Sequence, residues 1–299
     1  MRIIRYVNGH NLKQLAAVSV DNIVFDLPYP DFMSLVYYAR ENGKSALQVV
    51  SEEVSKSKSE KKLEQVKLTT PIDAPEVWAA GVTYEKSKEA RNYEATNGKL
   101  DSKTFYDKVY DAERPEIFIK STAARTVGPN DPVYLRSDSN WQIPEPELGL
   151  VIDKEGTVLG YIAGNDMSCR DIEGENPLYL PQAKIWKNSC SIGPAILLKD
   201  AVEDPYELKI ICRIYRNDEK VFDGEAKVKQ LKRTLNELVD YLIRDNDIFD
   251  GTVLMTGTCV VPPNEFTLND NDVIEIEIPE IGILRNPAKS QNLSLTNAN

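Results

Sequence analysis

The chain has 299 residues, of which 41% are hydrophobic and 28% charged, a composition typical of a folded globular protein and unlike that of a disordered one. Its length suits one large domain and one small domain. Asp and Glu outnumber Lys and Arg by 47 to 36, and the net charge of −11 would repel a phosphate backbone, so nucleic acid is not expected as a partner.

The first part of the chain is predicted to form a small α/β domain. Three short apolar stretches within residues 1–27 alternate as strands do, and residues 30–49 carry apolar side chains at helical spacing. A lysine-rich polar segment follows, which is typical of a solvated helix or a flexible connector. The proline-flanked sequence P-I-D-A-P at 71–75 then indicates a boundary between a domain of residues 1–72 and a domain of residues 73–299.

The second domain is predicted to be mainly β, which makes the fold class mainly β within α+β. Short apolar runs between turn residues predict strands at 77–81, 116–120, 132–135, 147–153, 157–163, 192–199, 207–216, 252–255 and 273–278. Residues 84–111 and 231–246 are predicted to be helical, the second because leucines recur there at helical spacing. The polar tail from Arg285 to Asn299 is expected to be loose.

Histidine and cysteine limit the chemistry that is available. The only histidine, His10, lies in a turn-like N-G-H-N, so general acids and bases elsewhere must be Asp, Glu, Lys, Tyr, Cys or water. The cysteines show no C-x-x-C spacing, which argues against structural zinc, and we expect them to be reduced and buried. They are Cys169, Cys190, Cys212 and Cys259.

The sequence also carries no sign of a membrane segment. No run approaches the roughly 18 apolar residues that a membrane helix needs. The start, M-R-I-I-R-Y-V-N-G-H, has too few consecutive apolar residues for a secretory signal. We therefore expect a cytoplasmic protein with no membrane partner.

Three acidic residues are predicted to meet at one end of a hairpin. In P-E-P-E-L-G-L, Glu145 and Glu147 stand two positions apart and so project from one face of a strand. The stretch behind them, L-G-L-V-I-D, K-E-G and T-V-L-G-Y-I-A-G-N-D, predicts a hairpin that brings Asp166 to the same end. Such a cluster must protonate, repel or bind a cation, unless all three side chains lie on a solvated face. An all-oxygen set suits Mg²⁺, with Mn²⁺ or Ca²⁺ as alternatives.

Four blocks together resemble the fumarylacetoacetate hydrolase family. They are P-E-P-E-L-G-L-V-I, G-N-D-M-S-C-R-D, K-I-W-K-N-S-C-S-I-G-P and M-T-G-T-C, in the order that the family has them. The resemblance implies a mixed β-sheet roll as the core domain, a homo-oligomer (dimer or tetramer) and a small-molecule substrate with a 2-oxo acid group. It also implies that Glu145, Glu147 and Asp166 are the metal ligands.

The same resemblance suggests further site residues. Lys184 matches the lysine that opens the third block, Arg170 matches the arginine after the metal-binding Asp, and Thr258 matches a threonine that in relatives helps hold a substrate carboxylate. Arg170 has an alternative role, in which it only balances Asp171 or the carboxylate cluster. Lys187, in the same block as Lys184, is more simply a surface lysine.

The chain departs from the family near the start of the core domain. Hydrolases of the family carry G-x-N-Y-x-x-H, in which the histidine activates the water that splits a carbon–carbon bond. Here the segment is G-V-T-Y-E-K-S, so Thr83 replaces the asparagine and Ser87 replaces the histidine. A serine without a histidine nearby cannot act as a comparable base, so we expect Ser87 to bind substrate instead.

The expected reaction is therefore a dehydration. A metal that polarises a 2-oxo acid acidifies its C3 protons, and a hydroxyl at C4 can then leave as water, as in a 2-keto-3-deoxy sugar acid. Lys184 is the candidate base, provided that burial or the nearby positive ion lowers its pKa. Glu116 is the candidate acid that protonates the leaving hydroxyl, unless it is a strand-edge residue that faces water.

Two alternative functions remain open from the sequence. An acylpyruvate hydrolase or an oxaloacetate decarboxylase would use the same metal but release a carbon fragment. A non-catalytic module that binds a cation or a sugar acid would use the carboxylates only to organise a binding loop.

Overall fold

The computed structural model describes residues 1–96 and 105–291 of the chain. The strands are β1 (Arg2–Val7), β2 (Lys13–Val18), β3 (Val24–Asp26), β4 (Lys67–Leu68), β5 (Glu76–Gly81), β6 (Glu116–Thr122), β7 (Thr126–Val127), β8 (Val133–Leu135), β9 (Gln142–Ile143), β10 (Pro146–Ile152), β11 (Val158–Asp166), β12 (Ser168–Cys169), β13 (Cys190–Leu198), β14 (Lys209–Arg216), β15 (Glu219–Lys227), β16 (Thr252–Met255), β17 (Val273–Ile278) and β18 (Gly282–Ser290). The α-helices are α1 (Phe32–Glu41), α2 (Ala46–Lys56), α3 (Glu85–Thr96), α4 (Phe105–Asp111), α5 (Arg170–Glu175), α6 (Leu180–Lys184) and α7 (Leu235–Ile243). Short 3₁₀ turns occur at Leu63–Gln65, Ala123–Arg125, Pro177–Tyr179, Lys199–Ala201, Pro205–Glu207 and Val228–Gln230. The predicted fold class, mainly β within α+β, is confirmed.

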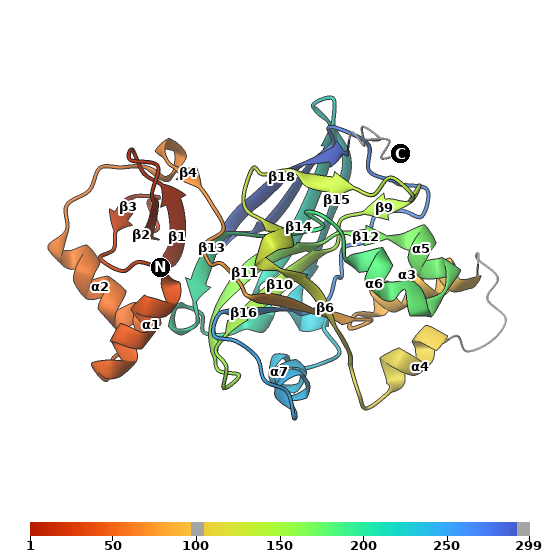
Figure 1. The fold of residues 1–299 in the computed structure, drawn as a ribbon, viewed down its shortest axis with the longest axis horizontal. Coiled ribbons are helices and arrows are strands. Elements are labelled where there is room, and N and C mark those ends of the chain that lie inside the picture. Colours follow the sequence, from red (N-terminus) through yellow and green to blue (C-terminus); the bar gives the residue numbers. More distant parts are fainter. Residues whose placement is uncertain (97–104, 292–299) are drawn as a thin grey trace, which may run out of the picture.

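One large mixed sheet closes on itself. Its strands follow the order β3-β2-β1-β13-β11-β10-β16-β5-β6 (Figure 1). After β6 the chain makes one 3₁₀ turn and enters β7, which pairs in parallel with β13 on the other side of β11. The segment from β6 to β7 therefore links the last strand of the path back to β13, so strands β13 to β6 form a roll. The predicted mixed β-sheet roll is present.

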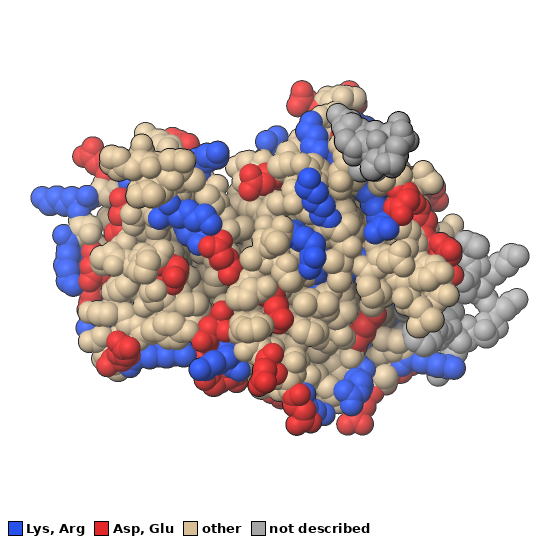
Figure 2. Space-filling view, in the orientation of Figure 1, with Lys and Arg blue, Asp and Glu red and all other residues tan. Residues whose placement is uncertain are grey.

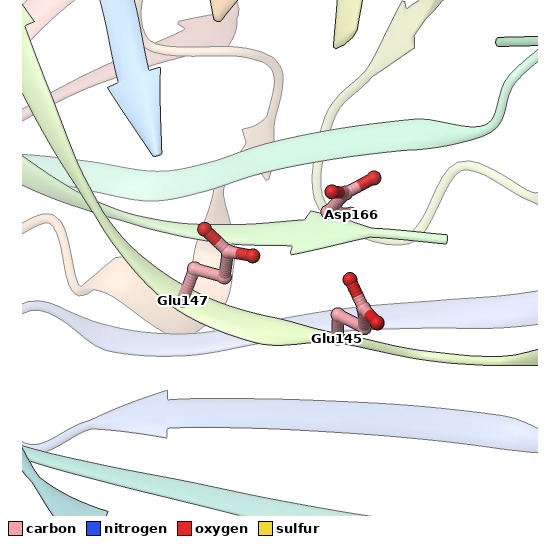
Figure 3. A group of neighbouring side chains, drawn as sticks. All are labelled: Glu145, Glu147 and Asp166. Carbon is pink, nitrogen blue, oxygen red and sulfur yellow. The ribbon is translucent and has the colours of Figure 1, made fainter. Parts of the chain in front are cut away.

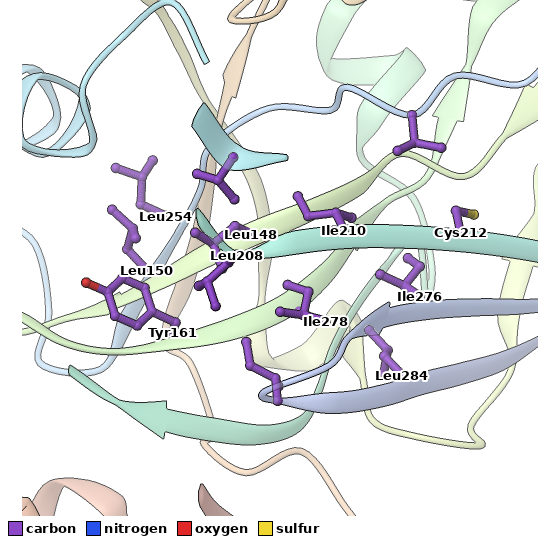
Figure 4. Packing of buried hydrophobic residues seen from close by; sticks show 14 of the residues in the cluster. Leu148, Leu150, Tyr161, Leu208, Ile210, Cys212, Leu254, Ile276, Ile278 and Leu284 are labelled. Carbon is purple, nitrogen blue, oxygen red and sulfur yellow. The ribbon is translucent and has the colours of Figure 1, made fainter. Parts of the chain in front are cut away.

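A second sheet packs on the outside of the roll and encloses the main core. Its order is β15-β14-β17-β18-β8. Because side chains of a strand alternate between faces, every second residue of β10 and β11 points toward this sheet. The side chains that meet between the two sheets include Leu148, Leu150, Tyr161, Ile210, Cys212, Ile276, Ile278 and Leu284 (Figure 4). The predicted leucine stripe of α7 joins the same core.

The inner face of the roll forms a second core, which α1 and α2 cover at one end. Val151, Ile162 and Met255 of the roll cluster with Phe32 of α1 and Val50 of α2. Arg40 of α1 contacts Asp153 just beyond the last residue of β10, so α1 lies at that end of the roll. The beginning of β10, where the acidic residues are, lies at the opposite end.

The predicted division into a domain of residues 1–72 and a domain of residues 73–299 stays a prediction. Strand β1 pairs with β13, with Arg2 opposite Leu197, so β1, β2 and β3 extend the large sheet (Figure 1). A division into residues 1–72 and 73–299 would therefore cut through a shared sheet. None of the described helices is both long and apolar enough to span a membrane.

Several element bounds differ from the expected ones. The helical segment 84–111 contains α3 and α4, and residues 97–104 between them lie outside the described residues. Helix α7 begins only at Leu235, because Thr234 and Glu237 form a capping box there. The expectation of a loose tail from Arg285 was wrong as far as Ser290, since these residues complete β18 between β17 and β8. The rest of that tail, 292–299, lies outside the described residues.

Candidate active site

The structure brings the three predicted metal ligands together at one end of the β10–β11 hairpin. Ligand oxygens of Glu145, Glu147 and Asp166 lie within 4.8 Å of one another, and Figure 3 shows the three side chains grouped at these strand ends. All three residues are buried, with at most 4% of their surface exposed. This burial excludes the alternative of a solvated acidic face.

Strand alternation explains why these carboxylates converge. Glu147 lies in the same row as Gly149 and Val151 on the inner face of the roll, while the residues between them point to the main core. A turn centred near Glu155 would place Glu147 opposite residue 163, within one residue either way, and the structure pairs it with Gly164. The pattern E-x-E followed by an apolar row therefore places two carboxylates where the inner core of the roll ends.

Basic side chains surround the carboxylates. Lys184 Nζ contacts Glu145 Oε2 and lies 3.3 Å from Asp166 Oδ2. Lys120 Nζ lies 2.7 Å from Asp166 Oδ1. Arg170 Nη2 donates to Glu145 Oε1 at 3.2 Å, which supports the alternative that Arg170 balances the carboxylate cluster.

Asp171, the other partner considered for Arg170, is engaged elsewhere. Its carboxylate accepts hydrogen bonds of 2.6 Å from the Ser139 hydroxyl and the Asn140 N–H. Arg170 itself is 2% exposed, and this burial lowers its pKa to about 9. The guanidinium thus belongs to the site and not to the surface.

Burial and neighbouring charges shift the pKa values of the carboxylates in different directions. Burial raises the pKa of Glu147 well above its ordinary value, and the Asp166 and Glu145 carboxylates raise it further. Burial also raises the pKa of Glu145, although Lys184 opposes this shift. Burial also acts to raise the pKa of Asp166. The ammonium groups of Lys120 and Lys184 outweigh burial, so the pKa of Asp166 is lowered.

The pKa of Lys184 is raised, which is opposite to what we expected of a base. Burial acts to lower this pKa, but the Asp166 and Glu145 carboxylates together outweigh burial. A cation bound by these two carboxylates would oppose their effect on the pKa of Lys184. The sequence argument named burial or a nearby positive ion as the cause of a lowered pKa. Burial alone does not lower it here, because two carboxylates contact the ammonium, and the effect of the ion stays a prediction.

Glu116 stands at the edge of the site, opposite Gly81 in the β5–β6 pair. A Cβ atom at Gly81 would overlap Glu116 Oε2, so glycine is what allows the glutamate to fold over the backbone of β5. This oxygen is buried and has no hydrogen-bond partner among the described residues. Burial raises the pKa of Glu116 although Arg91 opposes it, so the solvated strand-edge alternative does not describe this residue.

One narrow pocket joins the predicted residues. The triad, Lys184 and the three expected substrate-binding residues all line it, whereas Glu116 is not among the lining residues but lies against one of them, Gly81. The lining residues are Ala80, Gly81, Val82, Ser87, Arg91, Phe118, Glu145, Glu147, Asp166, Arg170, Lys184 and Thr258. The sequence thus indicated most of the polar wall of the pocket.

Three contributors were missed from the sequence. Lys120 and Arg91 were not singled out, and Arg91 contacts the buried Glu173. The Gly257 N–H donates to Glu147 Oε2 at 2.6 Å, from a backbone with φ +100 that favours glycine. The sequence offered no clear signal for Lys120, because this residue stands at a bulge of the β5–β6 pair, where strand alternation does not fix the direction of a side chain.

The donor set fits a hard divalent cation. Three buried carboxylates supply only oxygen, and the Gly257 amide holds one of them in place. Carboxylate oxygens are the ligands that Mg²⁺ and Ca²⁺ take in proteins. Glu145, Glu147 and Asp166 are therefore the residues that would hold the ion.

Comparisons with known proteins agree with this arrangement. The sequence model of the fumarylacetoacetate (FAA) hydrolase C-terminal family matches residues 87–289. The chain is 46% identical over 229 residues to the 2-dehydro-3-deoxy-D-arabinonate dehydratase of Saccharolobus solfataricus, covering 77% of this chain and 76% of that protein. It is also 46% identical over 218 residues to a probable 2-keto-3-deoxyxylonate dehydratase of Haloferax volcanii, covering 73% of each.

A solved structure is similar over nearly the whole chain. It is 2-keto-3-deoxy-D-arabinonate dehydratase complexed with magnesium and 2,5-dioxopentanoate. The TM-score is 0.80 at 37% identity, and the match covers 97% of this chain and 99% of that one. The similarity therefore includes the first 72 residues as well as the roll.

Proposed function

Because this chain belongs to the fumarylacetoacetate hydrolase family, we propose that it is a magnesium-dependent dehydratase of a 2-keto-3-deoxy sugar acid. The expected reaction converts 2-keto-3-deoxy-D-arabinonate to 2,5-dioxopentanoate and water, as a step in pentose catabolism. The observation that carries the proposal is the buried carboxylate triad beside Lys184, in a pocket where Ser87 replaces the hydrolytic histidine. The similarity to two dehydratases supports the choice of substrate class.

The metal and the triad define one end of the pocket. When bound, magnesium would polarise the 2-keto group and stabilise the negative charge that develops as the C3 proton leaves. Glu145, Glu147 and Asp166 would hold it. Arg170 and Thr258, which line the same pocket, are the proposed contacts for the substrate carboxylate.

Lys184 is the proposed group that moves the proton at C3. Its Nζ lies in the pocket wall and contacts Glu145 Oε2 and Ser168 Oγ. Burial acts to lower its pKa, and the Asp166 and Glu145 carboxylates outweigh burial and raise it. A divalent ion held by the same two carboxylates would oppose their effect and favour the neutral amine, which can take the C3 proton.

Glu116 is the proposed acid that protonates the leaving hydroxyl at C4. Its raised pKa extends the protonated form to higher pH, so activity should fall as the pH rises through that pKa. Loss of the C3 proton and the C4 hydroxyl yields water and a C3–C4 double bond. Transfer of a proton from C5 to C3 and of the enol proton to C4 then gives the C5 aldehyde.

A mass-resolved assay of a panel of 2-keto-3-deoxy acids, with and without Mg²⁺, tests the function. We expect products lighter by one water, with an aldehyde and an unchanged carbon count, only when the ion is present. Faster cleavage of acylpyruvates or oxaloacetate would instead establish the alternative of a hydrolase or decarboxylase. Absence of metal-dependent turnover of any 2-oxo acid would leave the binding module.

We further propose a cytoplasmic homo-oligomer, dimer or tetramer, with a division of each chain near residue 72. The four cysteines are free and buried, which suits a reducing compartment. Light scattering of the purified protein would give the number of subunits, and limited proteolysis would show whether cleavage concentrates near residues 71–75.

A further inference from the structure

Lys120 is a fully buried lysine that the proposed chemistry leaves without a role. Its side chain is 0% exposed, and it is not among the described residues that line the pocket. A buried ammonium is unfavourable unless it is paired and hydrogen-bonded. The partners of Lys120 therefore indicate what the residue is for.

Lys120 stands at a β-bulge of the β5–β6 pair. Across the β5–β6 pair, Val77 lies opposite Ser121 and Trp78 lies opposite Ile119, so Lys120 is the extra residue with no partner. A bulge bends its strand and turns a side chain in a new direction. Lys120 reaches Asp166 although β6 and β11 are separated by three strands, because the roll brings β6 back over the site.

Among the described residues, the Lys120 ammonium contacts the framework of the site. Its Nζ lies 2.7 Å from Asp166 Oδ1, donates to the Met167 carbonyl at 2.8 Å and donates to the Lys184 carbonyl. It also lies 5.1 Å from the centre of the Trp186 ring. These partners come from the end of β11 and from α6 with the residues that follow it.

The contacts form a closed ring that includes Lys184. Asp166 Oδ1 faces Lys120, and Asp166 Oδ2 lies 3.3 Å from Lys184 Nζ. Lys120 also holds the backbone carbonyl of Lys184, to which the Ser189 hydroxyl donates at 3.1 Å. One ammonium thus fixes both a triad carboxylate and the backbone of the neighbouring lysine.

We infer that Lys120 is a positioning residue, which holds Asp166 and Lys184 in the arrangement that the metal triad and the proton transfer require. The inference rests on the proposed metal-dependent dehydration and deepens it. Lys120 acts through these two residues and does not touch substrate. A packing role alone would be filled equally well by an apolar side chain of similar shape.

The test compares Lys120→Met, which keeps the shape, with Lys120→Arg, which keeps the charge. Mn²⁺ affinity is measured by electron paramagnetic resonance without substrate, and kcat and KM are measured with Mg²⁺. Loss of such a supporting contact typically lowers metal affinity or activity about 10- to 100-fold, so we expect Lys120→Met to show both losses with KM changed by less than about threefold. Lys120→Arg should be less impaired in both quantities.

Lys187→Met is the matched control. Lys187 is exposed, contacts the ring of Tyr134 and lies outside the pocket, so its loss should leave Mn²⁺ affinity and kcat at wild-type values. Thermal unfolding and circular dichroism establish that each variant is folded before it is compared.

Wild-type Mn²⁺ affinity and kcat in folded Lys120→Met would overturn the inference, and so would a Met variant more active than the Arg variant. If Lys120→Met does not fold, a crystal structure of the Mn²⁺-loaded wild type decides instead. Nζ on Asp166 supports the positioning role, and Nζ turned into the pocket contradicts it. A wild-type protein that binds Mn²⁺ but dehydrates no sugar acid would refute the proposed function. The comparison of Mn²⁺ affinity between the wild type and the Lys120 variants would still test the positioning role.

Discussion

Ion pairs occur in two contrasting environments of this molecule. In the site, Lys120 and Lys184 are at most 1% exposed and pair with carboxylates that are also buried. On the outer face of the second sheet, Arg213 lies 2.7 Å from Glu277, and both side chains are about a quarter exposed. Figure 2 shows acidic and basic side chains interspersed over the visible surface.

The comparison shows that the distance between two charged groups says little by itself about the role of the pair. Exposed pairs contribute about 0–1 kcal/mol, because water screens them and side-chain entropy opposes them. Buried pairs carry a large desolvation penalty, so removing one partner leaves the other charge strongly unfavourable. Charges buried at such expense in a pocket are candidates for function.

The largest expected effects come from breaking the triad in two different ways. Asp166→Asn and Glu147→Gln should each abolish metal-dependent activity and Mn²⁺ binding. Only Asp166→Asn should also destabilise the fold, by about 3–5 kcal/mol, because Lys120 and Lys184 lose their shared anion. Glu147 has no basic contact in the described structure and accepts from the Gly257 amide, so its variant should unfold near the wild-type midpoint.

Urea denaturation monitored by circular dichroism measures this difference, with electron paramagnetic resonance of Mn²⁺ as the binding assay. Equal stability losses in the two variants would contradict the contrast between paired and unpaired carboxylates. Full activity of the wild type after exhaustive chelation would remove the metal from the proposal altogether.

Lys184→Met should come next, because it removes the group that moves the C3 proton while leaving the three carboxylates. Solvent deuterium exchange at C3 of bound pyruvate should stop, and the metal content should remain at the wild-type value. Nuclear magnetic resonance of pyruvate in D₂O measures the exchange. Exchange at the wild-type rate would assign the base to another residue.

Ser87→Ala should have a smaller effect, since one hydrogen bond to substrate is lost. We expect KM to rise about tenfold, equivalent to about 1.4 kcal/mol, while some dehydration survives. Initial-rate kinetics with the sugar acid measures both parameters. If the wild type cleaves acylpyruvates faster than it dehydrates sugar acids, and Ser87→Ala eliminates that cleavage, the dehydratase assignment is wrong.

The smallest effect is expected from Arg213→Ala on the outer face. The free energy of unfolding should change by less than about 1 kcal/mol, and kcat and KM should not change. A urea titration and one kinetic series suffice. A loss as large as that of Asp166→Asn would mean that exposure does not separate the two classes of ion pair.

Local pattern was enough to predict the parts of the site that lie on one hairpin. Glu145, Glu147 and Asp166 follow from strand alternation and a short turn, and the observed register lies within the one residue of slip that the prediction allowed. The leucines of α7 were equally clear. Resemblance of the sequence blocks added Lys184, Arg170 and Thr258, which line the same pocket.

Contacts between residues on distant strands could not be predicted from the sequence. Lys120 reaches Asp166 only because the sheet closes, and no local pattern states the order of strands in a sheet. The pKa of Lys184 depends on two carboxylates that approach it in three dimensions. The extent of β18 was missed for a similar reason, because its polar residues form a strand by pairing with β17 on one side and β8 on the other.

The bulge at Lys120 has a consequence for engineering. Idealised design favours regular strands whose lengths match across a sheet. Deleting a residue next to Lys120 would give β5 and β6 equal lengths and remove the bulge. It would also turn the lysine side chain away from Asp166. At this edge, chain length is a functional property, and a redesign that preserves every amino-acid type in the site could still produce an inert protein.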